Sequence, residues 1–206
     1  MAPKLVVVFY SATGNVARMG ESIARGAAEF GADVRLREVS ETAPEAAIDS
    51  NPRWRRYVDS SGHPEQPQLA DLEWADGIAI GSPTRFGGPA AQLKNFLDTT
   101  GGLWAKGVLG NKVATSFTTA STAHGGLEST LLAMNNIFYH WGSVILPLGY
   151  GHKHLGESGN PYGSSFVSRR SASPDEVALE ACRLHGRRLA QVAGFVAAGL
   201  AAETVG

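Results

Sequence analysis

The sequence has 206 residues, 43% of them apolar and 18% charged, which is the composition of about one folded domain and not of a disordered chain. The 18 basic and 19 acidic residues leave a formal charge of −1, which argues against a strongly basic nucleic-acid binder. The single cysteine, Cys182, excludes an intramolecular disulfide and a metal site with several cysteine ligands. No apolar stretch is long enough to span a membrane, so we expect a soluble, cytoplasmic protein without membrane insertion.

The first part of the chain predicts a strand, a helix and a second strand. Residues 5–9 form a continuous β-branched and apolar run, which is typical of a strand buried on both faces of a parallel sheet. Apolar residues then recur at helical spacing between Val16 and Phe30, and Gly31 ends that pattern. Residues 34–37 alternate like a half-exposed strand, which completes one βαβ unit.

Residues 41–68 show no clear period and contain four prolines. We therefore expect a long excursion with at most one short helix. Within it, residues 53–57 read Arg-Trp-Arg-Arg-Tyr, and basic residues interleaved with aromatic ones are found in nucleic-acid-binding segments. Because the whole chain is nearly neutral, a surface or subunit-contact loop is the favoured interpretation.

The rest of the chain continues the alternation of strands and helices. A helix start is predicted at Ser173, with the serine as cap, Pro174 in the first turn and Glu176 three residues after the cap. Five strands alternating with helices predict one α/β domain over residues 1–206, with a parallel sheet. The further strands are expected at 77–80, 113–117 and 143–148, the further helices at 89–98 and 127–139, and a long loop that interrupts or follows the fifth strand at 149–163.

Three loops that follow predicted strands have the composition of a ligand site. Ligands of open parallel sheets bind beyond the carboxyl ends of the strands. The loop at 11–15 offers two hydroxyls and free backbone N–H groups at a helix N-terminus, which suit a phosphate monoester. It has neither the G-x-G-x-x-G pattern nor the P-loop pattern, and an ordinary capped turn is the alternative.

The other two loops are suited to a flat ring. The loop at 82–88 contains Phe86, which can stack on such a ring, and a glycine pair that permits close approach to the backbone. The loop at 118–126 is rich in small side chains that leave room and free amides for a planar group. Tight turns are the alternative for each loop alone, but three such loops together predict a binding site.

Other candidates are weaker. His152 and His154 lie on one loop without a nearby cysteine, so no metal site is predicted. Cys182 is expected to be a buried structural thiol. The chain has no G-x-S-x-G elbow, so Ser-His-Asp catalysis is not predicted.

Several sequence blocks occur in an order that resembles one known family. The chain resembles the WrbA family of flavodoxin-like NAD(P)H:quinone oxidoreductases from Lys4 to about the end of its last helix. The blocks that carry the resemblance are Ser11-x-Thr13-Gly14-Asn15, Ser82-Pro83-Thr84-Arg85-Phe86-Gly87, Gly101-Gly102-Leu103-Trp104, Ser121-x-x-His124-Gly125-Gly126-x-Glu128 and Pro161-Tyr162-Gly163.

The resemblance implies a fold and an activity. The fold would be a flavodoxin-like three-layer sandwich with a five-stranded parallel sheet in the order 2-1-3-4-5, forming a single FMN-binding domain. The activity would be an FMN-dependent, two-electron, ping-pong reduction of quinones by NADH or NADPH, in a homotetramer and without a strong catalytic acid or base. The alternatives are a one-electron flavodoxin-type carrier and a flavin-binding interaction protein, which would use residues 53–57 as its contact surface.

By motif position, the resemblance also implies which residues bind. Thr13 stands where the family often has a tyrosine that is linked to nicotinamide binding. Trp104 would line the substrate pocket across a tetramer interface, and His140 would contact FMN. The phosphate of FMN would be held by Ser11, Ala12, Thr13, Gly14, Asn15 and Val16, and its ring would be flanked by Thr84, Arg85, Phe86, Thr119, Ala120, Ser121, Thr122, Ala123, His124 and Gly125.

Overall fold

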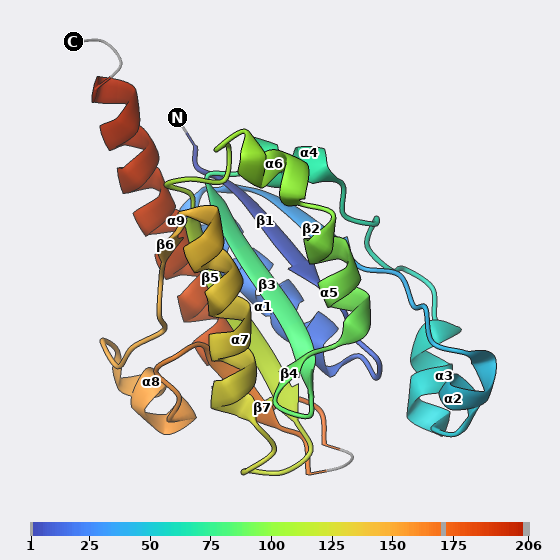
Figure 1. Ribbon diagram of the computed structural model, residues 1–206. Coiled ribbons are helices and arrows are strands. Elements are labelled where there is room, and N and C mark those ends of the chain that lie inside the picture. Colours follow the sequence, from blue (N-terminus) through green and yellow to red (C-terminus); the bar gives the residue numbers. More distant parts are fainter. Residues whose placement is uncertain (1, 170–171, 204–206) are drawn as a thin grey trace.

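A parallel sheet lies between two layers of helices in the computed structural model, which describes residues 2–169 and 172–203 (Figure 1). The main path of the sheet runs β2-β1-β3-β5-β6. Strand β1, the second on this path, pairs in parallel with β2 on one side and β3 on the other, so the chain winds in both directions from β1. The strands are β1 (Lys4–Phe9), β2 (Asp33–Glu38), β3 (Gly77–Arg85), β5 (Val113–Ala120) and β6 (Val144–Ile145).

The expected count of five strands is wrong, because the described residues form a seven-stranded sheet. The short strand β4 (Gly88–Pro89) folds back antiparallel on β3. Two short strands share the position of the fifth strand: β6, inside the predicted range 143–148, pairs with the start of β5, and β7 (Ser164–Val167), outside that range, pairs with its end. The strand expected over 143–148 ends at Ile145 because Pro147 has no N–H to donate to the ladder. The long loop therefore interrupts this strand position, and it carries α8 (Lys153–Ser158).

Side chains of β1 alternate between two apolar cores, as the period of a strand requires. Leu5, Val7 and Phe9 face α1 (Asn15–Phe30) and α9 (Glu176–Glu203). Val6 and Val8 face the opposite layer. That layer comprises α4 (Leu69–Trp74), α5 (Ala91–Asp98), α6 (Gly101–Ala105) and α7 (Leu127–Trp141).

The predicted start of the last helix is wrong by a few residues. Helix α9 begins at Glu176, and the backbone N–H of Ala178 donates to Asp175 Oδ1 at 2.9 Å. Asp175 therefore caps the helix in place of Ser173, and its negative charge also suits the positive end of the helix dipole. Among the described residues, every helix is too short or too polar to pass through a membrane.

The excursion at 41–68 contains two short helices, α2 (Glu45–Asp49) and α3 (Pro52–Val58), so the expectation of at most one is wrong. Helix α3 has a local start signal, because Asn51 accepts a hydrogen bond from the N–H of Arg53 and Pro52 occupies the first turn. Figure 1 shows both helices beside the end of the sheet at which β1 and β3 terminate. The excursion therefore lies next to the loops predicted to bind a ligand.

Candidate functional site

The three predicted loops meet around one cavity of about 380 Å³ at the carboxyl ends of β1, β3 and β5. Segments that are far apart in the sequence contribute to it, as the switch point of a doubly wound sheet requires. The lining residues are Ser11, Ala12, Thr13, Asn15, Val16, Ser50, Asn51, Arg53, Trp54, Pro83, Thr84, Arg85, Thr119, Ala120, Ser121 and Ser168.

The first loop is arranged as an anion cradle. Gly14 precedes α1 with a φ of 85°, and no side chain caps the helix. Ser11 Oγ accepts a hydrogen bond from the N–H of Gly14 at 3.1 Å, which closes the turn. A Cβ on Gly14 would lie 3.1 Å from the ring of Tyr57, so glycine is needed for both backbone and space. The uncapped N–H groups at the start of α1 are left for an anion.

The second and third loops are joined through Thr84. Its hydroxyl donates to the carbonyl of Gly125 at 3.3 Å and accepts from Thr130 Oγ1 at 2.8 Å. A Cβ on Gly126 would lie 2.9 Å from the Cα of Gly87, so small residues permit the two loops to touch. Thr84 therefore fixes the separation of the two walls between which a flat group would fit.

A cluster of Glu38, Tyr57 and His63 packs against the first loop. Tyr57 Oη donates to Glu38 Oε1 at 2.7 Å, and His63 Nδ1 lies 2.8 Å from Glu38 Oε2. Burial raises the pKa of Glu38, whereas its hydrogen bonds to His63 and Tyr57 act in the opposite direction. The hydrogen bond to Glu38 raises the pKa of His63. These contacts hold the Tyr57 ring against Gly14.

The structure does not bring every predicted site residue to the cavity. Phe86 is fully exposed and has a φ of 52°, a strained backbone for an aromatic residue. Thr122, Ala123 and His124 are exposed on the third loop and do not line the cavity. Helix α6, which carries Trp104, and the last turn of α7, which carries His140, lie toward the opposite end of the sheet, at which β3 begins (Figure 1). Trp104 is 58% exposed and does not line the cavity.

Sequence reasoning missed Ser50, Asn51, Arg53, Trp54 and Ser168, which line the cavity. The signal for two of them was present, since Arg53 and Trp54 belong to the basic and aromatic segment of the excursion. The near-neutral charge of the chain favours a surface or subunit-contact loop for that segment, and its position beside the other loops depends on tertiary contacts that the sequence pattern does not contain.

Three other candidates from the sequence, Cys182, His152 and His154, do not line the cavity. Cys182 is fully buried, as predicted, and burial raises the pKa of its thiol to about 12. The rings of His152 and His154 stack with centroids 5.2 Å apart. In the part of the chain that the structure describes, no group of three His, Cys, Asp or Glu residues is placed to hold a metal ion.

Comparisons with known proteins identify the family. Residues 4–154 match the family of NADPH-dependent FMN reductases. The chain is 43% identical to an NAD(P)H dehydrogenase (quinone) of Deinococcus radiodurans, over 80% of this chain and 83% of that protein. It is 40% identical to NAD(P)H dehydrogenase (quinone) 3 of Rhizobium meliloti, over 95% of this chain and 94% of that one.

Solved structures show the same fold. A flavodoxin, WrbA-like protein from Agrobacterium tumefaciens is similar with a TM-score of 0.67 and 27% identity, over 93% of this chain and 97% of that chain. A flavodoxin from the domain Archaea is similar with a TM-score of 0.61, 19% identity, and coverage of 93% of this chain and 99% of that one.

Proposed function

This chain belongs to the family of NAD(P)H dehydrogenases (quinone), and on that premise we propose that its cavity binds FMN and that the protein reduces quinones with NADH or NADPH. The observation that carries the proposal is the meeting of three loops around one cavity at the start of α1. We extend the proposal to the whole chain as one FMN-binding domain, with Gly14, Phe86 and residues 122–125 completing the loops.

The residues around the cavity fit FMN in charge and in shape. Arg53 and Arg85 are the only ionisable side chains among the described residues that line it, so the cavity favours an anion. The hydroxyls of Ser11 and Thr13 and the start of α1 would hold the phosphate monoester. Residues 83–85 and 119–121 would flank the ring, with the separation that Thr84 sets.

The side chains of this cavity perform binding and orientation. When bound, FMN supplies the redox chemistry, which is hydride acceptance from NAD(P)H and reduction of the quinone. Among the described lining residues there is no aspartate, glutamate, histidine or cysteine, so the chain offers no strong acid, base or nucleophile there. We propose that the donor and the quinone use this one site in turn and that two electrons move in each half of the cycle.

The identity of the released flavin tests the cofactor assignment. We expect the purified protein to be yellow and to release FMN, not FAD, when it is denatured, because the first loop fits a monoester and lacks a dinucleotide fingerprint. Chromatography of the supernatant measures this. Release of FAD contradicts the role given to residues 11–15.

Trp104 provides a test of assembly. We propose that the protein is a homotetramer in which the exposed Trp104 of one subunit forms part of the substrate pocket of another, together with His140 near its flavin. Stacking of an aromatic ring contributes about 0.5–1.5 kcal/mol beyond burial, so Trp104→Ala should lower kcat/KM for the quinone roughly three- to tenfold. Steady-state kinetics and flavin content measure this. Unchanged kinetics at full flavin content contradict the assignment, whereas joint loss of stability and flavin indicates a structural tryptophan.

A further inference from the structure

Helix α3 presents an aromatic side chain to the cofactor cavity. Among the described residues that line this cavity, Trp54 is the only aromatic one, and the remaining apolar lining residues are small or aliphatic. It comes from the excursion between β2 and α4, outside the sequence blocks that carry the family resemblance. A flat aromatic wall in a cavity with polar edges favours a flat aromatic ligand.

The indole of Trp54 is held by a carboxylate. Its Nε1 donates to Glu41 Oε2 at 2.7 Å. The same carboxylate accepts hydrogen bonds from Tyr10 Oη at 2.7 Å and Gln92 Nε2 at 2.6 Å. Burial alone would raise the pKa of Glu41, but hydrogen bonds from Tyr10, Ala43, Gln92 and Trp54 outweigh burial and lower it. Glu41 is therefore ionised at neutral pH, and its charge strengthens the bond that orients the indole.

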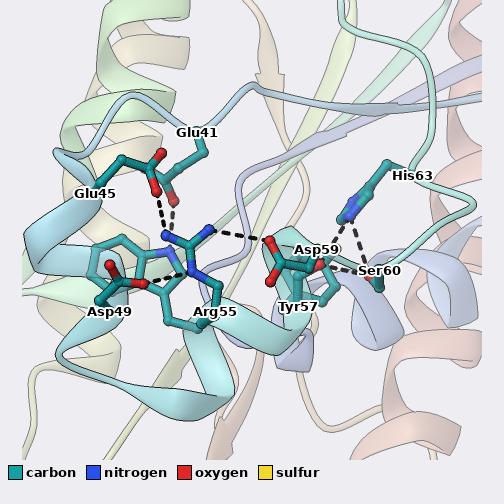
Figure 2. Close-up of polar contacts among 9 residues, drawn as sticks. Glu41, Glu45, Asp49, Arg55, Tyr57, Asp59, Ser60 and His63 are labelled. Carbon is teal, nitrogen blue, oxygen red and sulfur yellow. Dashed lines mark hydrogen bonds and ion pairs between the residues drawn. The ribbon is translucent and has the colours of Figure 1, made fainter.

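The helix that carries Trp54 is also held in place by its neighbour Arg55. Figure 2 shows the Arg55 guanidinium among three carboxylates, with Asp49 Oδ1 at 2.8 Å, Asp59 Oδ1 at 3.1 Å and Glu45 as the third partner. Glu45 and Asp49 belong to α2, so Arg55 ties the two short helices together. Each of these exposed pairs is weak alone, but the network restricts how α3 can turn. The wall is thus set before a ligand arrives.

We propose that Trp54 packs its indole against the isoalloxazine ring and that Glu41 is the positioning residue that fixes the indole. This assignment rests on the proposed binding of FMN in the same cavity. It gives the 41–68 excursion a role in cofactor binding, which differs from the contact surface that its sequence pattern indicates.

The first test compares Trp54→Leu and Trp54→Phe with the wild-type protein, by titrating each apoprotein with FMN and with riboflavin. Loss of the aromatic wall in Trp54→Leu should raise the dissociation constant about tenfold for both flavins, because they share the ring. An indole in contact with a flavin quenches its fluorescence by electron transfer, and a phenyl ring does not. Bound flavin in Trp54→Phe should therefore fluoresce more strongly than in the wild type. Trp74→Phe is the matched control, because Trp74 stacks on Arg35 away from the cavity.

The second test separates positioning from general stability. Glu41→Gln keeps the size of the side chain but removes the charge. It should weaken flavin binding less than Trp54→Leu does, and it should have almost no further effect in the Trp54→Leu background. Equal effects of Glu41→Gln in both backgrounds contradict its positioning role.

The outcomes distinguish the two proposals. A wild-type apoprotein that binds neither flavin contradicts the proposed function, and the role of Trp54 falls with it. Flavin that binds normally to the wild type, with unchanged affinity in Trp54→Leu and unchanged fluorescence in Trp54→Phe, contradicts the role of Trp54 alone. If Trp54→Leu does not fold, the fluorescence of Trp54→Phe decides.

Discussion

Replacing Gly186 with alanine is expected to lower the free energy of unfolding by about 3 kcal/mol, at the upper end of what overpacking costs. Gly186 on α9 faces α1, and a Cβ there would lie 1.9 Å from the carbonyl oxygen of Ile23. The contact is reciprocal, because a Cβ on Gly26 of α1 would lie 1.9 Å from the carbonyl oxygen of Arg183. Backbone atoms cannot turn aside as a flexible side chain can, so the two helices would have to separate.

Helix propensity alone predicts that Gly186→Ala raises the free energy of unfolding, so the sign of the measured change distinguishes propensity from packing. Alanine in place of glycine inside a free helix stabilises it by roughly 0.5–1 kcal/mol. Gly199, also in α9, has nothing within 4 Å of the position of its missing Cβ and serves as the control. We expect Gly186→Ala to melt roughly 6–12 °C below the wild type, and Gly199→Ala to melt at or slightly above it. Equal melting temperatures of the two variants would contradict the close packing of α1 on α9.

The second large effect concerns His185 and low pH. This histidine is fully buried, and its ring nitrogens lie 2.6 Å from Thr115 Oγ1 on β5 and 3.0 Å from Ser164 Oγ on β7. Burial lowers its pKa to about 4, whereas an unfolded histidine titrates near its usual 6.5. The unfolded chain therefore binds a proton that the folded chain does not as the pH falls below 6.5. The contribution of neutral His185 to the free energy of unfolding is therefore fully present above about pH 6.5. It is lost progressively as the pH falls to about 4.

Because of this lower pKa in the folded state, the contribution of His185 makes the free energy of unfolding about 3 kcal/mol smaller at pH 4 than at pH 7. We expect wild-type stability, measured by denaturant unfolding across this range, to fall by that much more than the stability of His185→Gln. Glutamine keeps hydrogen-bonding groups near Thr115 and Ser164 but does not titrate. Subtracting the two curves removes the contribution of the carboxylates, which titrate in both proteins. Parallel curves for the two proteins would show that His185 is not held neutral in the fold.

The sequence predicted the elements whose signal is local and periodic. Helix α1 was anticipated because apolar residues recur along it and Gly31 ends it, and the buried strand β1 because its residues are continuously apolar. Helices α2 and α3 could not be read in this way. They are five and seven residues long, and Arg55 holds them together through carboxylates up to ten residues away. The sequence also did not predict that two short strands, β6 and β7, occupy the edge of the sheet. Their positions depend on pairing with different halves of β5, which is a tertiary contact.

Some predicted site residues lie together in the structure because their own segment of the sequence contains the signal, although their role in binding stays a prediction. Ser11 follows β1, and Thr84 and Thr119 lie near the ends of β3 and β5, where the sequence has small polar residues; all three line the cavity. Trp54 was not predicted, because its orientation depends on Glu41, which is thirteen residues earlier in the sequence. Trp104 stays a prediction, because its place in the site depends on a second copy of the chain.

Steady-state kinetics of the FMN-loaded protein, with NADH or NADPH and a soluble quinone varied together, test the central claim most directly. If one cavity serves both substrates in turn, reciprocal plots at several fixed quinone concentrations should be parallel lines. One NAD(P)H should be consumed for each quinone reduced, and removal of FMN should abolish the reaction. With oxygen excluded, intersecting lines would contradict the use of one cavity by both substrates in turn. No consumption of NAD(P)H at full FMN content would contradict the assignment of this cavity as the site of quinone reduction.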